Sequence, residues 1–208
     1  MSIFKSFVSQ TRKPQGFLGK LMLGGMNGAG HAKLADWGMA RLEGLDPLSI
    51  AELGCGGGRN AAELLKKYPR SRLTAIDYSA LSVEKTEAYN NEAVKEGRCE
   101  VKQGDVSKLD LPDGSYDLAT AFETVYFWPG PDKSFAEVFR ILKKGGTFLI
   151  VNESNGEDET GKKYESIIDG MKCYTAEELT AALDHVGFST VAVCHHSEKP
   201  WLAVVAKK

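Results

Sequence analysis

The fold is decided by one stretch of the sequence, Ile50-Ala51-Glu52-Leu53-Gly54-Cys55-Gly56-Gly57-Gly58-Arg59-Asn60. A short apolar segment passes through an acidic residue into a glycine-rich turn, and residues 60–65 then favour a helix. Glycine is needed where a strand turns sharply into a helix and where the backbone must approach a ligand too closely for a Cβ atom. The stretch therefore predicts a strand, a turn and a helix that together bind a nucleotide cofactor.

The glycine spacing alone leaves the type of cofactor open. A dinucleotide fingerprint, G-x-G-x-x-G/A, requires a small third residue, and counting from Gly54 that position holds Arg59. Counting from Gly56 the pattern fits formally, with Ala61 as the third residue, but Gly54 and Cys55 then separate the strand from the motif. The glycines therefore do not decide between a dinucleotide and another nucleotide cofactor.

Two further acidic positions help to identify the type of nucleotide cofactor. Residues 72–77 read as a second buried strand that ends in Asp77, where a ribose diol would be bound; the alternative is a turn or helix N-cap aspartate beside Ser79. Residues 99–103 read as a third strand that runs into Gly104-Asp105. A dehydrogenase has no general need for an acid at the third strand, so this pair favours another cofactor.

The three motifs together resemble the class I S-adenosylmethionine-dependent methyltransferases. That family has an E/D-x-G-x-G-x-G turn, an acid ending the second strand and a G-D pair after the third, in this order. Residues 114–121 are similar to the family's fourth strand, and residues 141–150 to its L-K-P-G-G turn and fifth strand, with Lys144 in place of the proline. The resemblance covers residues 45–208 and implies S-adenosyl-L-methionine as the cofactor.

The resemblance also implies roles for individual residues. The backbone of Gly54, Cys55 and Gly56 would line the methionine part, Asp77 would take the ribose, and Asp105 with Val106 would reach the adenine edge. Tyr78 is placed against the adenine face, although it fits equally well as packing on the strand end. The predicted cofactor-binding residues are Glu52, Gly54, Cys55, Gly56, Gly58, Asp77, Tyr78, Asp105 and Val106.

The segment after the fourth strand is unusually aromatic for a loop. It reads Phe122-Glu123-Thr124-Val125-Tyr126-Phe127-Trp128-Pro129, at the strand end that faces the transferable methyl group in this architecture. We expect Glu123 to act as a general base or cation partner, with Tyr126 and Trp128 as walls of a substrate pocket. The alternative is that these aromatic residues anchor the next helix to the core.

The N-terminal segment, residues 1–44, is expected to form a helical cap over the cofactor. Two apolar helical faces are visible in it, one formed by Phe17, Leu18, Leu21, Met22 and Met26 and the other by Leu34, Ala35, Gly38, Met39 and Leu42. His31 is a candidate for orienting the substrate or taking its proton, and Trp37 for binding it. A packing or capping role is the alternative for His31.

Composition sets the class of protein. With 42% hydrophobic residues, 26% charged residues and a net charge of −2, the chain suits one globular unit and does not favour nucleic-acid binding. No apolar run approaches membrane-spanning length. The four cysteines lack C-x-x-C spacing, which predicts reduced thiols, no metal site and a cytoplasmic location; they are Cys55, Cys99, Cys173 and Cys194.

Strand and helix signals alternate from residue 48 onward, which predicts a doubly wound α/β fold. We expect a mostly parallel seven-stranded sheet with an antiparallel C-terminal strand, because the short connection Glu198-Lys199-Pro200 permits only a hairpin. Helices are expected on both faces, and residues 45–208 as the cofactor-binding domain. Helices are expected at 59–68, 80–96 and 132–142, and a capped helix after Thr175. Glu157-Asp158-Glu159 is expected to be a solvated loop, with a mobile flap over the substrate as the alternative.

The predicted function is methyl transfer from S-adenosyl-L-methionine to a small-molecule acceptor by in-line displacement. Three alternatives remain open at this point. One is an NAD(P)-dependent oxidoreductase or epimerase, against which Asp105 and the terminal hairpin argue. The second is a protein that binds S-adenosyl-L-methionine without catalysing a reaction. The third is a protein or RNA methyltransferase, although the sequence offers no evident recognition domain or basic stripe.

Overall fold

The computed structural model describes residues 28–208, whose strands form one seven-stranded sheet in the order β3-β2-β1-β4-β5-β7-β6. Strands β1 to β5 pair in parallel, and β7 pairs antiparallel with both β5 and β6. The strands are β1 (Ser49–Leu53), β2 (Arg72–Asp77), β3 (Cys99–Gln103), β4 (Tyr116–Phe122), β5 (Leu142–Asn152), β6 (Thr190–His195) and β7 (Leu202–Lys207). The predicted fold class, including the antiparallel C-terminal strand, is confirmed.

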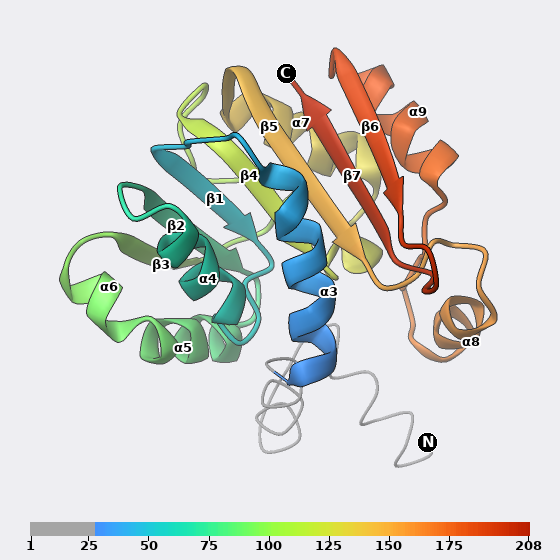
Figure 1. Ribbon diagram of the computed structural model, residues 1–208, viewed down its shortest axis with the longest axis horizontal. Coiled ribbons are helices and arrows are strands. Elements are labelled where there is room, and N and C mark those ends of the chain that lie inside the picture. The colour runs from blue at the N-terminus through green and yellow to red at the C-terminus, as the bar shows by residue number, and fades with distance from the viewer. Residues whose placement is uncertain (1–27) are drawn as a thin grey trace.

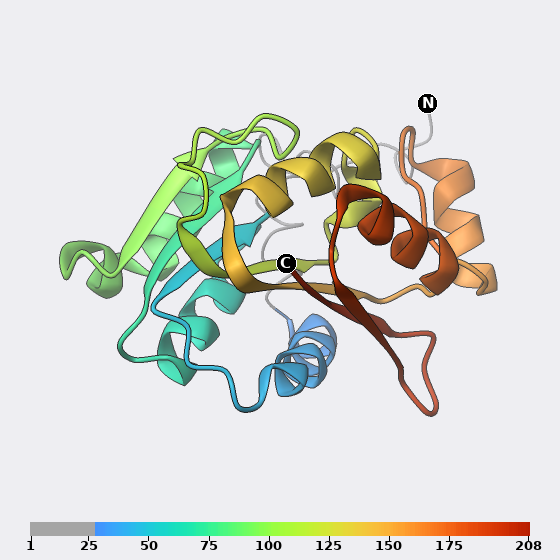
Figure 2. The same ribbon diagram turned by 90° about the horizontal axis from the view of Figure 1, so that it is seen from above.

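Helices cover both faces of the sheet (Figures 1 and 2). Helices α7 (Pro131–Ile141) and α9 (Ala176–Val186) pack together on one face, and α3 (Ala29–Met39) and α4 (Arg59–Lys67) lie on the other (Figure 2). The remaining helical segments are η2 (Ala40–Leu42), α5 (Ala80–Tyr89), α6 (Asn91–Lys95), η3 (Val125–Phe127) and α8 (Glu159–Ile167). This three-layer arrangement buries both faces of the parallel strands, as their continuous apolar sequences require.

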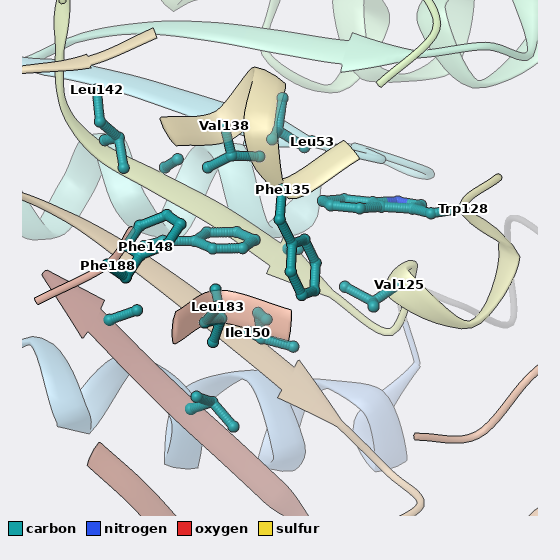
Figure 3. Packing of buried hydrophobic residues seen from close by; sticks show 14 of the residues in the cluster. Leu53, Val125, Trp128, Phe135, Val138, Leu142, Phe148, Ile150, Leu183 and Phe188 are labelled. Atoms are coloured by element: carbon teal, nitrogen blue, oxygen red, sulfur yellow. The ribbon is translucent and has the colours of Figure 1, made fainter. Parts of the chain in front are cut away.

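The core under α7 and α9 is built around aromatic rings (Figure 3). Phe135 and Phe148 are fully buried and meet edge to face, with ring centroids 5.7 Å apart. Trp128 stacks on Phe148 with an interplanar angle of 10°. Burial of each such ring contributes about 1.5–3 kcal/mol, so this cluster holds the segment that follows β4 firmly to the sheet.

The opposite core places α3 directly on the sheet. A Cβ atom on Gly38 would lie 2.3 Å from Cγ2 of Val151 on β5, so the glycine permits the close approach of the helix. Leu34 and Leu42 are buried in the same cluster as Leu149. Residues 28–44 thus share a core with the sheet, while residues 1–27 and the first predicted helical face lie outside the described residues; the cap at 1–44 remains a prediction.

Two predicted elements differ from the structure. The helix expected at 80–96 is divided into α5 and α6 at Asn90, whose side-chain amide donates to the carbonyl oxygens of Gly58 and Thr86. Of the charged segment 157–159, expected as a solvated loop, Glu157 and Asp158 precede α8 and only Glu159 belongs to it, because Asp158 caps the helix by accepting from the Gly161 amide at 2.8 Å. A hydrogen bond to a distant segment accompanies the first difference, and local capping accounts for the second.

Candidate active site

A cavity of about 820 Å³ lies at the carboxyl ends of the parallel strands. Its walls come from the segments that follow β1 to β5, from the first turn of α3, from α8 and from residues 199–201 before β7. In Figure 1 the arrowheads of β1, β4 and β5, the N-terminal end of α3 and helix α8 gather at this lower edge of the sheet. Ligands bind at this edge in open α/β sheets.

The glycine turn after β1 forms one wall and has a shape that only glycine permits. Gly54 has φ +87°, and a Cβ atom there would lie 2.2 Å from Oγ1 of Thr124. The amides of Gly54 and Cys55 both donate to the carbonyl oxygen of Ile76, at 2.7 and 3.0 Å. The turn therefore brings its backbone up to the cavity without side chains in the way, which fits an extended nucleotide cofactor.

Gly58 has a different role from the other two glycines. It is absent from the described lining of the cavity. A Cβ atom on Gly58, which has φ +85°, would lie 2.8 Å from Cα of Thr86 on α5. Its side-chain-free backbone therefore lets α4 begin against α5, which is a packing role, and the predicted contact of Gly58 with the cofactor remains a prediction.

Asp77 lies at the end of β2, lines the cavity and is only 9% exposed. Its Oδ2 atom accepts from the Gly56 amide at 3.0 Å and its Oδ1 atom from the Ser79 amide at 2.9 Å. Burial raises the pKa of Asp77, and these two amide hydrogen bonds oppose that rise. Ser79 itself caps α5. Asp77 is thus not the helix cap, and its carboxylate lines the cavity as a hydrogen-bond acceptor.

Other predicted cofactor residues divide between the cavity wall and the sheet. Cys55, Gly56, Tyr78, Asp105 and Val106 all line the cavity. Glu52 does not: it is 1% exposed within β1, and its Oε2 atom has no hydrogen-bond partner among the described residues. Burial, followed by the charge of Asp77, raises the pKa of Glu52 well above its usual range. Glu52 therefore lies within β1, two residues before the glycine turn, and does not line the cavity.

His31 and Glu123, which are 92 residues apart, meet in the cavity. Nδ1 of His31 lies 2.5 Å from Oε2 of Glu123, and the two side chains are 43% and 22% exposed. Glu123 has φ +55°, and its amide donates to the carbonyl oxygen of Val151 at 2.8 Å. The hydrogen bond to Glu123 is the largest cause that raises the pKa of His31. The two predicted catalytic residues thus form one polar group.

Glu153, which sequence analysis missed, joins this pair. The three residues each offer one possible ligand atom, and these atoms lie within 4.8 Å of one another. They are a carboxylate oxygen of Glu153, a carboxylate oxygen of Glu123 and a ring nitrogen of His31. Burial, and then repulsion from Glu123, raises the pKa of Glu153. Its position one residue after β5 was the available signal, because the carboxyl ends of parallel strands meet at one edge of the sheet.

The aromatic segment after β4 serves the cavity and the core together. Tyr126, Phe127 and Trp128 line the cavity. Nε1 of Trp128 donates to Oγ1 of Thr124 at 3.1 Å, and the phenolic oxygen of Tyr126 accepts from the Ser154 amide at 3.0 Å. Trp128 also belongs to the aromatic core shown in Figure 3. Both of our interpretations of this segment therefore apply to Trp128.

Trp37 lies beside the cavity wall and not in it. Its ring centroid is 5.9 Å from that of Trp201 and 5.6 Å from that of His196. Among the described lining residues only Trp201 of these three is present. Trp37, on α3, therefore packs against Trp201, which lies between β6 and β7 and lines the cavity.

Helix α8 and the residues that flank it supply a wall of the cavity that the sequence analysis did not predict. Asp158, Thr160, Gly161, Tyr164 and Ile168 line the cavity. Asp158 also accepts from the Ser154 hydroxyl, which ties the helix start to the end of β5. The sequence signal was present as an aspartate three residues before Gly161, with Tyr164 and Ile168 at helical spacing.

Comparison with known proteins identifies the domain. Residues 51–150 match the family model of a methyltransferase domain. A sterol 24-C-methyltransferase of Yarrowia lipolytica is 26% identical over 172 residues, covering 76% of this chain and 45% of that protein. A malonyl-(acyl-carrier protein) O-methyltransferase of Geobacter sulfurreducens is 28% identical over 166 residues, covering 75% and 61%. The crystal structure of a methyltransferase from Aquifex aeolicus superposes with a TM-score of 0.71 at 18% identity, covering 89% and 96%.

The chain spans less than two thirds of the length of these two curated relatives. The matched segment begins within β1 and ends within β5, so it contains the glycine turn, Asp77, Asp105 and Glu123. The solved structure has the same fold. Residues 51–150 thus form a methyltransferase domain, and the motif order and sheet topology of residues 28–208 are similar to those of the class I S-adenosylmethionine-dependent methyltransferases.

Proposed function

We propose that this protein catalyses methyl transfer from S-adenosyl-L-methionine to a small-molecule acceptor. The observation that carries the proposal is one cavity that joins the glycine turn and Asp77 at one side to His31 and Glu123 at the other. A cofactor site next to a polar acceptor site is what a two-substrate transfer requires, because the reacting atoms must be held in line.

At the cofactor side of the cavity, backbone and side-chain groups of the protein bind and orient S-adenosyl-L-methionine. When the cofactor is bound, Gly54, Cys55 and Gly56 would present backbone to the methionine part, Asp77 would accept hydrogen bonds from the ribose, and Asp105 with Val106 would contact the adenine edge. When bound, S-adenosyl-L-methionine supplies a methyl group whose bond to sulfur breaks as the acceptor's nucleophilic atom bonds to it, leaving S-adenosylhomocysteine and a proton. The buried side chain of Asp77 gives a strong hydrogen bond because water does not compete there.

At the acceptor side, Glu123 accepts a hydrogen bond from a protic group of the acceptor. His31 holds the Glu123 carboxylate through the 2.5 Å contact, so the acceptor is oriented by a fixed group. Tyr126, Trp128 and Trp201 supply apolar surface that excludes water from the reacting atoms. We therefore assign the substrate class as small molecules with an apolar body and one polar end.

The location of the protein is a separate proposal. Among residues 28–208, no helix combines the length and apolar character that a membrane span requires. The four cysteines are free thiols, and three of them are buried. We propose the reducing cytoplasm as the compartment and no nucleic-acid partner.

The test has two stages. Calorimetric titration should show saturable binding of S-adenosylhomocysteine to the full chain, with no displacement by NAD. Incubation with methyl-labelled S-adenosyl-L-methionine and fractionated cell extract should then label one small compound. Binding without labelling in any fraction would favour the non-catalytic alternative, and binding of NAD in place of S-adenosylhomocysteine would contradict the proposal.

A further inference from the structure

We infer that His31, Glu123 and Glu153 form a binding site for one divalent metal ion at the acceptor end of the cavity. The three residues come from three separate elements: the first turn of α3, the segment after β4 and the segment after β5. One imidazole nitrogen and two carboxylates are the ligand types that suit zinc, manganese and iron(II) ions. The four cysteines take no part, so the absence of C-x-x-C spacing does not bear on this site.

The ligand atoms are close enough to share one ion after a small shift of the side chains. They lie within 4.8 Å of one another, and ligand atoms that share an ion at bond lengths of about 2.1 Å are roughly 3–4 Å apart. Glu153 is exposed, so its side chain has room to turn toward the other two. Binding of the ion would replace the direct His31–Glu123 hydrogen bond.

The charges around the cluster favour a cation. Two carboxylates face each other, and among residues 28–208 His31 is the only basic side chain that forms an ion pair with either of them. Arg59, which also lines the cavity, is engaged with Asp36 on α3 at 2.7 Å. Two close carboxylates in a partly buried site repel each other unless a cation lies between them.

The site remains open toward the cavity. All three residues are lining residues, so a bound ion with three protein ligands keeps further coordination positions for water or for an acceptor. An acceptor with an oxygen atom next to its nucleophilic position would bind the ion directly, and the ion would lower the pKa of a hydroxyl group. This role in the reaction rests on the proposed function, whereas binding of the ion does not.

The experiment uses the full chain after removal of metals with a chelator and without any cofactor. Titration calorimetry with zinc, manganese and magnesium chlorides should show one transition-metal ion per chain, bound more tightly than magnesium. Glu153→Gln keeps the shape of the side chain and should weaken binding at least tenfold. Glu157→Gln removes the same charge from an exposed residue outside the cavity lining and should leave binding unchanged.

Cobalt(II) gives an independent measurement of the ligands. Its visible absorption should appear on binding and should change in intensity in His31→Gln, because loss of the imidazole alters the coordination. Circular dichroism shows whether each variant is folded, and a folded variant is required for each comparison. No binding at millimolar metal, or equal affinity in Glu153→Gln and the unaltered protein, would overturn the inference.

A competing occupant is distinguished in the same assay. Methylammonium is titrated in the same way. If it binds to the unaltered protein but not to Glu153→Gln, while zinc and manganese do not bind, the cluster is a site for an organic cation. The metal inference would then be wrong. Binding of S-adenosylhomocysteine is measured in a separate titration. Failure of the metal site therefore leaves the methyl-transfer proposal standing, and failure of cofactor binding leaves the metal result standing.

Discussion

The Asp77 carboxylate and the Gly56 amide are joined by a hydrogen bond of 3.0 Å across 21 residues of sequence. The acid at the end of β2 thus holds the second glycine of the turn after β1, while it also lines the cavity. One side chain therefore fixes the shape of the turn and offers acceptors for ligand hydroxyls. Loss of this carboxylate should affect cofactor binding by both routes.

Asp77→Ala is expected to weaken binding of S-adenosylhomocysteine tenfold or more, because a buried hydrogen bond to a charged group contributes about 1.5–3 kcal/mol. Titration calorimetry measures the change. Asp110→Ala removes an exposed aspartate after β3 and is the matched control, with unchanged affinity expected. Equal affinities for the Asp77→Ala variant and the unaltered protein would show that the ribose lies elsewhere.

Gly54→Ala should be far more damaging than Gly97→Ala. Both glycines have positive φ, +87° and +69°, and alanine in this region costs about 1–2 kcal/mol. A Cβ atom at Gly97 meets nothing within 4 Å, whereas at Gly54 it would collide with Thr124. Thermal unfolding should therefore show a modest loss of stability for Gly97→Ala and a larger one for Gly54→Ala, with cofactor binding abolished only in the latter. Similar losses in the two variants would contradict the close approach of Thr124.

The positive φ of Glu123 predicts an unusual order of stability. Glycine adopts a φ of +55° without strain, whereas alanine keeps the cost of the left-handed region. The free energy of unfolding of Glu123→Gly should therefore exceed that of Glu123→Ala by about 1 kcal/mol. Glu123→Gly should accordingly unfold at a higher temperature under the same conditions. Both variants lose the carboxylate, so both should have low methyl-transfer activity. A less stable glycine variant would mean that the backbone at this position is not strained.

Asp117 connects three strands and makes the stability dependent on pH. Burial alone would raise its pKa, but hydrogen bonds from Lys143 and Ser49 and from the Leu48 and Ser49 amides outweigh burial and lower it. A lowered pKa in the folded state means that the carboxylate stabilises the fold above the pKa of the unfolded chain. That contribution is lost as the pH falls through the folded pKa.

Asp117→Asn should therefore reduce the free energy of unfolding by about 1–3 kcal/mol at neutral pH. The difference between variant and unaltered protein should shrink as the pH falls below the pKa of an unfolded aspartate, about 3.9, and through the lower pKa of the folded state. Urea unfolding at a series of pH values measures this. A difference that does not depend on pH would mean that the charge of Asp117 contributes nothing.

The fold was predictable because its signals are local and repeated. The β2 and β3 boundaries expected from apolar runs agree with the structure, and the Thr175 capping box begins α9 as expected. Asn90 was less predictable, because the break that it makes between α5 and α6 depends on Gly58, which is 32 residues away. Periodicity within a segment does not reveal a hydrogen bond to another segment.

The candidate site was predictable where it follows a strand end and less so elsewhere. Asp77 and Glu123 follow from motif position, and His31 was selected as a residue type, but the contact between His31 and Glu123 depends on where α3 lies on the sheet. Trp37 shows the converse, because its ring faces Trp201 and not the cavity. The orientation of one helix thus decides which of its residues belong to the site.

The sheet order divides the cavity wall into two sets of segments. Groups near the predicted cofactor come from the ends of β1, β2 and β3, whereas those at the other end follow β4 and β5 or belong to α3 and α8. Thr124 joins the two sets, because it lies against Gly54. Substitutions in the second set that leave Thr124 unchanged should therefore alter selectivity without rebuilding the donor half of the cavity.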